Sequence, residues 1–296
     1  MSTLFLVGSG IGNQAQTIPA FYLAKTRYPD ITVVNTEPYN IDTTRMLFRG
    51  LADVFTEEEI APRLGEFNRQ IQTFFSNRSF LGITRALNRR PVPGESEVEH
   101  NMLSTGLPHS VADMSVVGDC LDYIEPQQDV PDVIIHDGYN KNSVEPEYGE
   151  DKWLAKSYLH WQWVAELLMM RGLRVGSIES ESEHVEGTED LTGLPIEQSV
   201  AVMKGSRVVL SNDTGSYHLC NLIGRENVVV FTMTSLIKNN DPRFHRYSTV
   251  VSSMMPCAPC QDIGNSFWYH NRHKCHWACR GDTDPKEVVH QAMTLL

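Results

Sequence analysis

Short runs of valine, isoleucine and leucine alternate with segments of helical periodicity along most of this chain. Each run has the length of one strand, and each helical segment is long enough to carry the chain back across a sheet. Parallel strands need such crossovers, so the alternation predicts βαβ units and parallel sheets. The clearest runs are "LFLVG" at 4–8, "ITVVNT" at 31–36, "VIIHDG" at 133–138, "RVVLSN" at 207–212 and "NVVVFT" at 227–232.

The 296 residues suffice for two domains of ordinary size. A proline-containing connection, "IEPQQDVP" at 124–131, separates two sets of strand-like runs. We therefore predict an α/β fold with two Rossmann-like, doubly wound domains, residues 1–130 and residues 131–296. Helices are expected at 13–28, 152–171 and 215–223, and the pattern of residues 41–109 is mostly helical and loop-like.

The net charge of −12 argues against broad binding to nucleic acid or to anionic membranes. The sequence has no apolar run of roughly 18 residues, and its start lacks the basic stretch of a secretory signal. A cytoplasmic protein without a transmembrane segment is therefore expected.

Positive charge gathers locally in residues 61–90, where Glu66 is the only acid. This segment is either a solvated helix pair or a binding site for an anionic acceptor, because arginine matches the geometry of phosphates and carboxylates. Its arginines are Arg63, Arg69, Arg78, Arg85, Arg89 and Arg90.

The motif "SNDTGSYHL" at 211–219 directly follows a strand-like run. In an open parallel sheet, ligands bind beyond the carboxyl ends of the strands, and a helix N-terminus there attracts phosphate. Gly215 lets the backbone approach such a ligand, Thr214 adds a hydroxyl group, and His218 lies one helical turn further on. Asp213 would accept a hydrogen bond from a sugar hydroxyl or hold the turn. The alternative is simple helix capping by Asp213 or Thr214, with His218 in the core.

The turn "VGSGIGN" at 7–13 has alternating glycines at Gly8, Gly10 and Gly12. A nicotinamide-binding turn would have glycine or alanine where Asn13 stands, and the next strand would end on an acidic residue, which "ITVVNT" does not. The spacing therefore disfavours an NAD-dependent dehydrogenase.

Four of the six cysteines have a spacing close to that of a four-thiolate zinc site. They are Cys257, Cys260, Cys275 and Cys279. Disulfides are not normally kept in the cytoplasm, so the alternatives are a structural zinc ion or reduced, packed thiols. Four closed ligands would leave no open position, so a catalytic zinc ion is not expected.

Several segments resemble glycosyltransferase family 9, the ADP-heptose:lipopolysaccharide heptosyltransferases, whose fold is GT-B. "GSGIGNQAQTIPAFYLAKTRYPD" is similar to the family's opening loop and helix, and "VIIHDG…DKW…WVAELLMMRGLRVGSIES" to the start of its donor domain. "SNDTGSYHLCNLIG…VVVFTMTS" resembles its "nDSG/nDTG" signature, and "PCAPC…HKCHWACRGDTDPKEVVHQAMTLL" its cysteine-containing tail. Residues 41–129 match little. The resemblance implies two Rossmann-like domains that face a cleft, the second of which binds a nucleotide-sugar donor.

The resemblance also implies roles for individual residues. Gly12, Asp213, Thr214, Gly215 and His218 would bind the diphosphate and sugar of the donor. Lys152 would neutralise the departing diphosphate; without the family it would be taken for an exposed lysine. A carboxylate of "SIESESE", Glu179 or Glu181, would bind the ribose hydroxyls, and of the two we predict Glu181; a solvated acidic loop is the alternative.

Asn13 departs from the family pattern, which often has an aspartate as general base directly after the glycine turn. An amide cannot accept a proton at neutral pH, so Asn13 could orient an acceptor without deprotonating it. Asp137 and Asp119 are the candidate bases in its place; otherwise, catalysis depends on stabilising the leaving group.

The predicted function is transfer of a sugar from a nucleotide-diphosphate donor to a hydroxyl of an anionic acceptor. By resemblance it is inverting, independent of metal and of any catalytic cofactor, and directed to a lipopolysaccharide core-type glycan. Two alternatives are glycosylation of a hydroxymethylated base in DNA, which the overall acidity disfavours, and nucleotide-sugar binding without catalysis, which Asn13 suggests.

Overall fold

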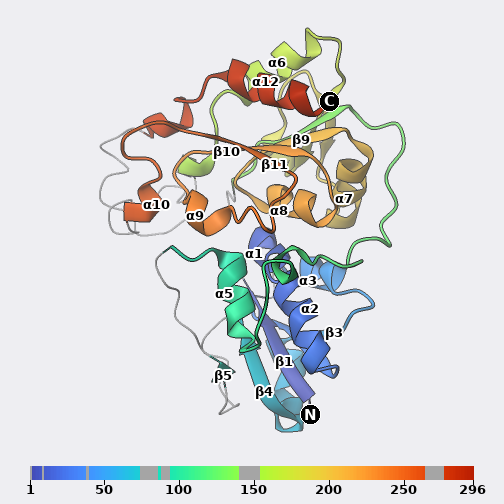
Figure 1. Ribbon diagram of the computed structural model, residues 1–296. Helices are drawn as coiled ribbons and strands as arrows, with labels where there is room; N and C mark the ends of the chain where they lie inside the picture. The colour runs from blue at the N-terminus through green and yellow to red at the C-terminus, as the bar shows by residue number, and fades with distance from the viewer. Residues whose placement is uncertain are drawn as a thin grey trace. The chain divides into compact units, whose positions relative to one another are not determined.

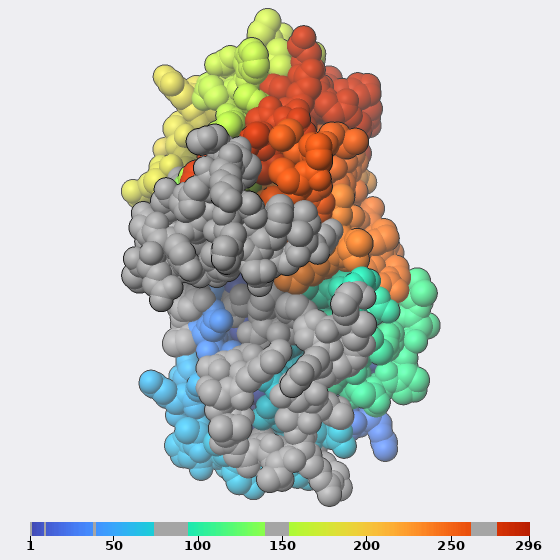
Figure 2. All heavy atoms as spheres, turned by 90° about the vertical axis from the view of Figure 1, so that its left-hand side faces the viewer, coloured from blue at the N-terminus to red at the C-terminus, as the bar shows by residue number. Residues whose placement is uncertain are grey.

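The computed structural model describes residues 2–8, 10–37, 40–73, 86–87, 94–139, 154–263 and 277–296. The chain divides into two compact units. Unit 1 comprises Met1–Tyr123 and Asn240–Arg246, and unit 2 comprises Ile124–Asn239 and Tyr247–Leu296. Figure 1 colours both along the chain, and the same colours mark their atoms in Figure 2. Each unit is described by itself.

Unit 1 contains a five-stranded parallel sheet in the order β3-β2-β1-β4-β5. The strands are β1 Ser2–Val7, β2 Ile31–Asn35, β3 Asp53–Thr56, β4 Phe67–Gln72 and β5 Ala86–Leu87. β1 is central and pairs with both β2 and β4, and its residues Thr3–Val7 are all fully buried. A strand covered on both faces has no polar face, which is why "LFLV" is a continuous apolar run.

Helices cover the two faces of this sheet. They are α1 Ile11–Ala15, α2 Ile18–Arg27, α3 Ile41–Leu47, α4 Glu57–Ile60 and α5 Glu97–Ser104, with 3₁₀ turns η2 Ala61–Glu66 and η3 Asp113–Ser115. On one face, Phe5 of β1 meets Phe21 of α2 edge to face at 5.6 Å, and Phe21 meets Phe48 at 4.9 Å. On the other face, Leu4 and Leu6 pack with Ile60 of α4.

The helix predicted at 13–28 is divided into α1 and α2. The break lies at Gln16 and Thr17, just before Pro19, which occupies the first turn of α2. A proline suits a first turn because its missing N–H has no helical partner there.

The mostly helical and loop-like pattern predicted for residues 41–109 was wrong in part, because β3, β4 and β5 lie within it. β4, with the sequence "FNRQIQ", is the neighbour of β1 although four of its six residues are polar. Gln70 and Gln72 are nevertheless buried. Polar residues at buried strand positions do not produce the apolar pattern by which a strand is recognised.

Unit 2 contains a six-stranded parallel sheet in the order β11-β10-β9-β6-β7-β8. The strands are β6 Val133–His136, β7 Val175–Glu179, β8 Glu189–Thr192, β9 Val208–Asn212, β10 Asn227–Phe231 and β11 Ser248–Ser252. This order changes direction between β6 and β9. Such a reversal is where open parallel sheets bind ligands.

Helices cover both faces of this sheet, with α6 and α12 on one side and α7 and α8 on the other (Figure 1). The helices are α6 Trp161–Met169, α7 Ile196–Gly205, α8 Gly215–Leu222, α9 Leu236–Asn239, α10 Cys260–Ile263 and α12 Pro285–Leu295. The 3₁₀ turns are η4 Leu154–Lys156, η5 Glu181–Glu183 and η6 Ala278–Arg280. Val228 and Val230 of β10 join the core under α6 and α12, while Val229 and Phe231 pack with Tyr217 of α8. Successive side chains of β10 point to opposite faces of the sheet, so this strand contributes to the core on each face.

The helix predicted at 152–171 is shorter than expected. Residues 151–153 lie outside the described residues, η4 follows, and α6 begins only at Trp161. The backbone N–H of Tyr158 donates to Oδ1 of Asn212 at 3.0 Å, and so does the indole N–H of Trp161 at 3.2 Å. A tertiary hydrogen bond thus replaces the helical one in this segment.

The division between the units falls after Tyr123, and a late segment, residues 240–246, is part of unit 1. Asp241 of this segment accepts a hydrogen bond from Ser96, the N-cap of α5, at 2.5 Å. Arg243 donates to Asp241 and, at 3.0 Å, to Glu99 of α5. These charge-assisted bonds attach the late segment to α5.

In the described part of the chain, no helix is long and apolar enough to cross a membrane.

Replacing Phe21 by alanine should lower the free energy of unfolding by about 3–5 kcal/mol, because it leaves a cavity between Phe5 and Phe48. Urea denaturation followed by circular dichroism measures this. The control is Val111→Ala at a position that is 64% exposed, where the change should stay within about 0.5 kcal/mol. Equal effects of the two substitutions would contradict the assigned core.

Candidate functional site

Polar side chains gather where the three adjacent strands β9, β6 and β7 end. β6 ends at His136, β7 at Glu179 and β9 at Asn212, and Asp213 and Thr214 follow before α8 begins. Because parallel strands end on the same edge of a sheet, these residues share one edge of unit 2. We call this set, with Ser216 of α8, the strand-end cluster.

Asn212 fixes the shape of this edge. Its side-chain oxygen accepts the hydrogen bonds from Tyr158 and Trp161, and its amide donates to the carbonyl oxygens of Asp137 at 3.1 Å and Gly138 at 3.0 Å. The completely buried side chain thus uses both its donors and its acceptor. It joins the end of β9 to the loop after β6 and to the start of α6.

The N-terminus of α8 lies within the strand-end cluster. Thr214 is its N-cap with extended backbone, φ −141° and ψ −176°, and its side chain makes no capping hydrogen bond to the helix. The simple capping role considered for Thr214 is therefore not what the geometry shows. The first N–H groups of a helix and its dipole form a site that favours an anion.

Asp213 is only 2% exposed and lies among groups that stabilise its charge. Oδ2 lies 3.7 Å from the ammonium of Lys156 and accepts a hydrogen bond from Asn239 at 2.9 Å, and Oδ1 lies 3.7 Å from Nε2 of His218. Burial acts to raise the pKa of Asp213, but Lys156, His218 and the Thr234 hydroxyl outweigh it and hold the pKa well below its usual range. Asp213 is thus an ionised anchor of the turn.

His136, which is buried, contacts two other members of the cluster. Its Nε2 lies 3.1 Å from Oε1 of Glu179, and its Nδ1 lies 2.7 Å from the Thr214 hydroxyl. Burial lowers the pKa of His136, but the negative charge and hydrogen bond of Glu179 reverse this, so that the pKa is raised. Burial likewise acts to raise the pKa of Glu179, while His136 and Ser216 bring it below its usual value. The two groups form an ion pair.

Glu179, not Glu181, is the carboxylate that the structure brings into this cluster. It accepts a hydrogen bond from Ser216 at 3.0 Å, whereas Glu181 is an exposed residue of η5. Glu179 has φ +100°, a left-handed conformation that non-glycine residues seldom adopt. Strain of this kind persists only where the surroundings hold a residue in place, and it is common at functional sites.

Among the described residues, His136, Glu179 and Glu183 are close enough to hold a metal ion, with one potential ligand atom from each within 4.8 Å of the others. Their hydrogen bonds already account for this closeness. Glu179 binds His136 and Ser216, His136 binds Thr214, and Glu183 accepts from the N–H of Ser180. The arrangement fits a hydrogen-bonded set of protein groups.

The structure gives the predicted zinc site no support. Cys275 lies outside the described residues. Cys260 and Cys279 are buried in one apolar cluster with Met233, and Cys257 is half-buried. Within the described ranges these three cysteines are not a group with metal-ligand spacing.

The remaining predicted residues are distributed over both units. Gly12 and Asn13 lie on α1 of unit 1, Gly12 buried and Asn13 half-buried, and Asp119 accepts a hydrogen bond from the Tyr22 hydroxyl at 2.9 Å. Asp137 is half-buried at the end of β6 in unit 2. Lys152 falls outside the residues that the structure describes.

Of the arginine-rich segment, Arg63 and Arg69 are described. Arg63 pairs with Glu66 at 3.0 Å on the surface, and Arg69 lies over the ring of Tyr28, 4.4 Å from its centroid. Neither is part of a helix pair, because η2 leads directly into β4. The other four arginines, Arg78, Arg85, Arg89 and Arg90, are outside the described ranges.

Four residues of the site, His136, Lys156, Ser216 and Asn239, were not predicted from the sequence. A histidine at the end of a strand-like run was the available signal for His136, since its position there places it on the ligand-binding edge. No sequence pattern marks Lys156 or Asn239 as part of the site. They reach Asp213 only through the tertiary arrangement of η4 and α9.

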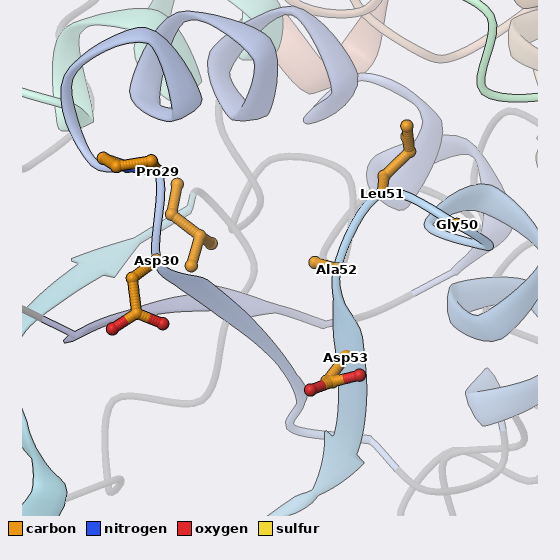
Figure 3. A pocket seen from close by; sticks show the side chains of 7 residues that line it. Pro29, Asp30, Gly50, Leu51, Ala52 and Asp53 are labelled. Atoms are coloured by element: carbon orange, nitrogen blue, oxygen red, sulfur yellow. The ribbon is translucent and has the colours of Figure 1, made fainter.

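In unit 1, a hollow of about 360 Å³ lies at the edge of the sheet where β2 and β3 begin. Asp30 and Asp53 line it with Gly50 and Leu51 (Figure 3). It is open to solvent, and it lies at the amino ends of the strands, away from the edge at which such folds bind ligands. We assign it no function.

Comparison with known proteins supports the sequence resemblance. Residues 152–269 match the model of glycosyltransferase family 9 (heptosyltransferase). This segment includes α8 and the "SNDTG" turn. No curated protein sequence matches the chain.

Three solved structures share the architecture. The E. coli heptosyltransferase WaaC with ADP is 14% identical, with a TM-score of 0.62 over 93% of this chain and 99% of that one. The iron-containing dodecameric glycosyltransferase TibC from enterotoxigenic E. coli H10407 is 14% identical, with a TM-score of 0.68 over 99% of this chain and 78% of that one. A family 9 glycosyltransferase from Veillonella parvula DSM 2008 is 10% identical, with a TM-score of 0.64 over 99% of this chain and 96% of that one. These likenesses confirm the predicted α/β, GT-B fold.

Replacing Asp213 by asparagine should lower the free energy of unfolding by about 3 kcal/mol at pH 7, because Lys156 loses its counter-charge. The folded pKa of Asp213 is depressed, so its contribution is fully present above its unfolded pKa of about 3.9, begins to shrink below that pH, and is lost only as the pH falls through the folded pKa. Urea titrations from pH 7 to pH 3 should show a constant difference between the two proteins that shrinks below about pH 4. A difference that does not shrink between pH 4 and pH 3 would contradict this.

Proposed function

We propose that this chain, a glycosyltransferase with the GT-B fold, transfers a sugar from a nucleoside-diphosphate donor that binds at the strand-end cluster of unit 2. The observation that carries the proposal is the N-terminus of α8, which begins at the "SNDTG" turn and whose N-cap makes no capping hydrogen bond to the helix. A diphosphate matches such a site in charge and in its number of acceptor oxygens. The family match over residues 152–269 supports the same ligand class.

The donor's diphosphate would accept hydrogen bonds from the first N–H groups of α8 and from Thr214. Lys156, held 3.7 Å from Asp213, adds a cation next to this turn. Negative charge grows on the diphosphate as the bond to the sugar breaks, so a preorganised cation and helix dipole stabilise the transition state more than the ground state. Lys152 remains proposed for the same role.

The nucleoside would lie beside Glu179, whose carboxylate can accept hydrogen bonds from ribose hydroxyls. Asp213, Asn212 and His218 are largely enclosed by protein. We therefore propose that they position the turn, while the backbone of Gly215 and Ser216 contacts the ligand.

We further propose an inverting displacement without a catalytic metal ion, as the family resemblance implies. Asn13 would orient the acceptor hydroxyl, and Asp137 would be the general base. The acceptor would be anionic, bound by the arginine-rich segment at 61–90, and a lipopolysaccharide core-type glycan is the first to test. WaaC and TibC have been described in complex with ADP and ADP-D-β-D-heptose, so adenosine is the first nucleoside to test.

Thermal stabilisation by ADP, GDP, CDP and UDP tests the donor site. A nucleotide at about 100 times its dissociation constant should stabilise the protein by about 2.7 kcal/mol. Lys156→Met, which removes the charge and keeps the length, should weaken binding about tenfold, whereas Lys286→Met on α12 should not. Absence of any response to all four nucleotides would refute the proposed donor site.

Transfer is tested separately by incubating the protein with ADP-heptose and core-type glycan and measuring ADP release. We expect release to depend on the glycan and to fall at least about tenfold in Asp137→Asn. Nucleotide binding without release in the presence of glycan or of hydroxymethylated DNA would favour a binding protein without catalysis.

We also propose that the cysteine-rich tail holds a structural metal ion. The spacing of the four cysteines in the sequence supports this, and TibC is described as iron-containing. Elemental analysis of the purified protein should find about one zinc or iron ion per chain, lost in Cys279→Ser but kept in Cys120→Ser. Protein that folds with neither metal would contradict the proposal.

A further inference from the structure

His136 is the residue of the strand-end cluster that joins the two parts of the proposed donor site. Its Nδ1 lies 2.7 Å from the hydroxyl of Thr214, the N-cap of α8. Its Nε2 lies 3.1 Å from Glu179. The imidazole is 4% exposed, and its neighbour Gly138 leaves no room for a side chain, because a Cβ there would lie 2.2 Å from Nε2. The ring is therefore held in one orientation.

The protonation state of His136 decides which way the Thr214 hydroxyl can donate. A charged imidazole donates from both nitrogens, to Glu179 and to the Thr214 oxygen. The Thr214 proton must then point elsewhere, and the nearest protein acceptor described, the carbonyl of Asn212, is at 3.4 Å. A ligand oxygen at the N-terminus of α8 can receive that proton.

A neutral imidazole reverses this arrangement. Beside a carboxylate the remaining proton stays on Nε2, so Nδ1 becomes an acceptor. The Thr214 hydroxyl then donates to Nδ1 and turns its lone pairs toward the ligand. The Thr214 oxygen and the ligand oxygen are then both acceptors and repel each other. An anionic ligand therefore loses the hydrogen bond from Thr214 and faces the partial negative charge of its oxygen.

The charges that face His136 favour its protonated form. Glu179 lies at the end of β7, Glu183 on η5 and Asp137 on the loop after β6, and all three raise the pKa of His136. From α8 the neutral Thr214 faces the ring. Asp213, next to Thr214 in the chain, contacts Lys156 and His218.

We propose that His136 is a positioning residue whose proton directs the Thr214 hydroxyl toward the donor diphosphate, so that nucleotide binding weakens when His136 loses this proton. The proposal rests on the proposed donor site. It adds a pH-dependent step that the helix N-terminus would not supply.

His136→Gln is the discriminating variant, because a glutamine amide mimics the neutral ring with a donor for Glu179 and an acceptor for Thr214. Titration calorimetry with ADP, GDP, CDP and UDP from pH 7 to pH 9.5 avoids the second phosphate ionisation near pH 6. For each nucleotide that binds, the affinity of the wild type should fall about tenfold over this range. The affinity of His136→Gln should not change with pH and should equal that of the wild type at the alkaline end of the range.

Two further variants serve as controls. Thr214→Val removes the hydroxyl and should bind weakly without pH dependence. His290→Gln, at an exposed position on α12, should keep the wild-type profile. Nitrogen-15 NMR of the wild-type histidines adds a readout that needs no variant, and His136 should carry protons on both nitrogens at pH 7.

A flat wild-type profile, an unchanged profile in His136→Gln or a neutral His136 at pH 7 would each overturn the proposal while leaving the donor site intact. Binding of one Mn²⁺ that is lost in His136→Gln would overturn it in favour of a metal site. If the wild type binds none of the four nucleotides, the proposed function fails and this inference fails with it.

Discussion

The buried carboxylate of Asp213 is the constraint on which the strand-end cluster depends. A charge that is 2% exposed must be compensated, and Lys156, His218 and Asn239 do so from three separate segments, η4, α8 and α9. These segments are therefore held around the end of β9. Asn212, the preceding residue, extends the same constraint to the loop after β6 and to α6 through four further hydrogen bonds.

The ion pair of His136 and Glu179 complements this anchor. Asp213 is compensated by the Lys156 ammonium and by hydrogen bonding, whereas His136 is compensated by Glu179 and contacts Thr214 with its other nitrogen. The two arrangements meet at Asp213 and Thr214, which are adjacent in the chain. The turn before α8 is thus supported from both sides, which holds its first N–H groups in place. Such preorganisation suits a site where charge develops during reaction.

Parts of this arrangement could be predicted from the sequence, because they follow local rules. Fully buried strands such as β6, β9 and β10 are continuous apolar runs, and the "SNDTG" turn follows one of them directly. β4 was not predicted, because its buried glutamines conceal the strand pattern. The interruption before α6 was not predicted either, because the group that binds the Tyr158 N–H belongs to Asn212, 54 residues away.

The sequence by itself determined the α/β class, the parallel sheets and the location of the turn at Asp213–Gly215 between a buried strand and a helix. Each follows from the period and length of nearby residues, which local sequence contains. Only the tertiary structure decided that Lys156 compensates Asp213, that Glu179 and not Glu181 enters the cluster, and that residues 240–246 pack in unit 1. These contacts join residues far apart in the chain, and their energies depend on burial and orientation, which no local pattern encodes.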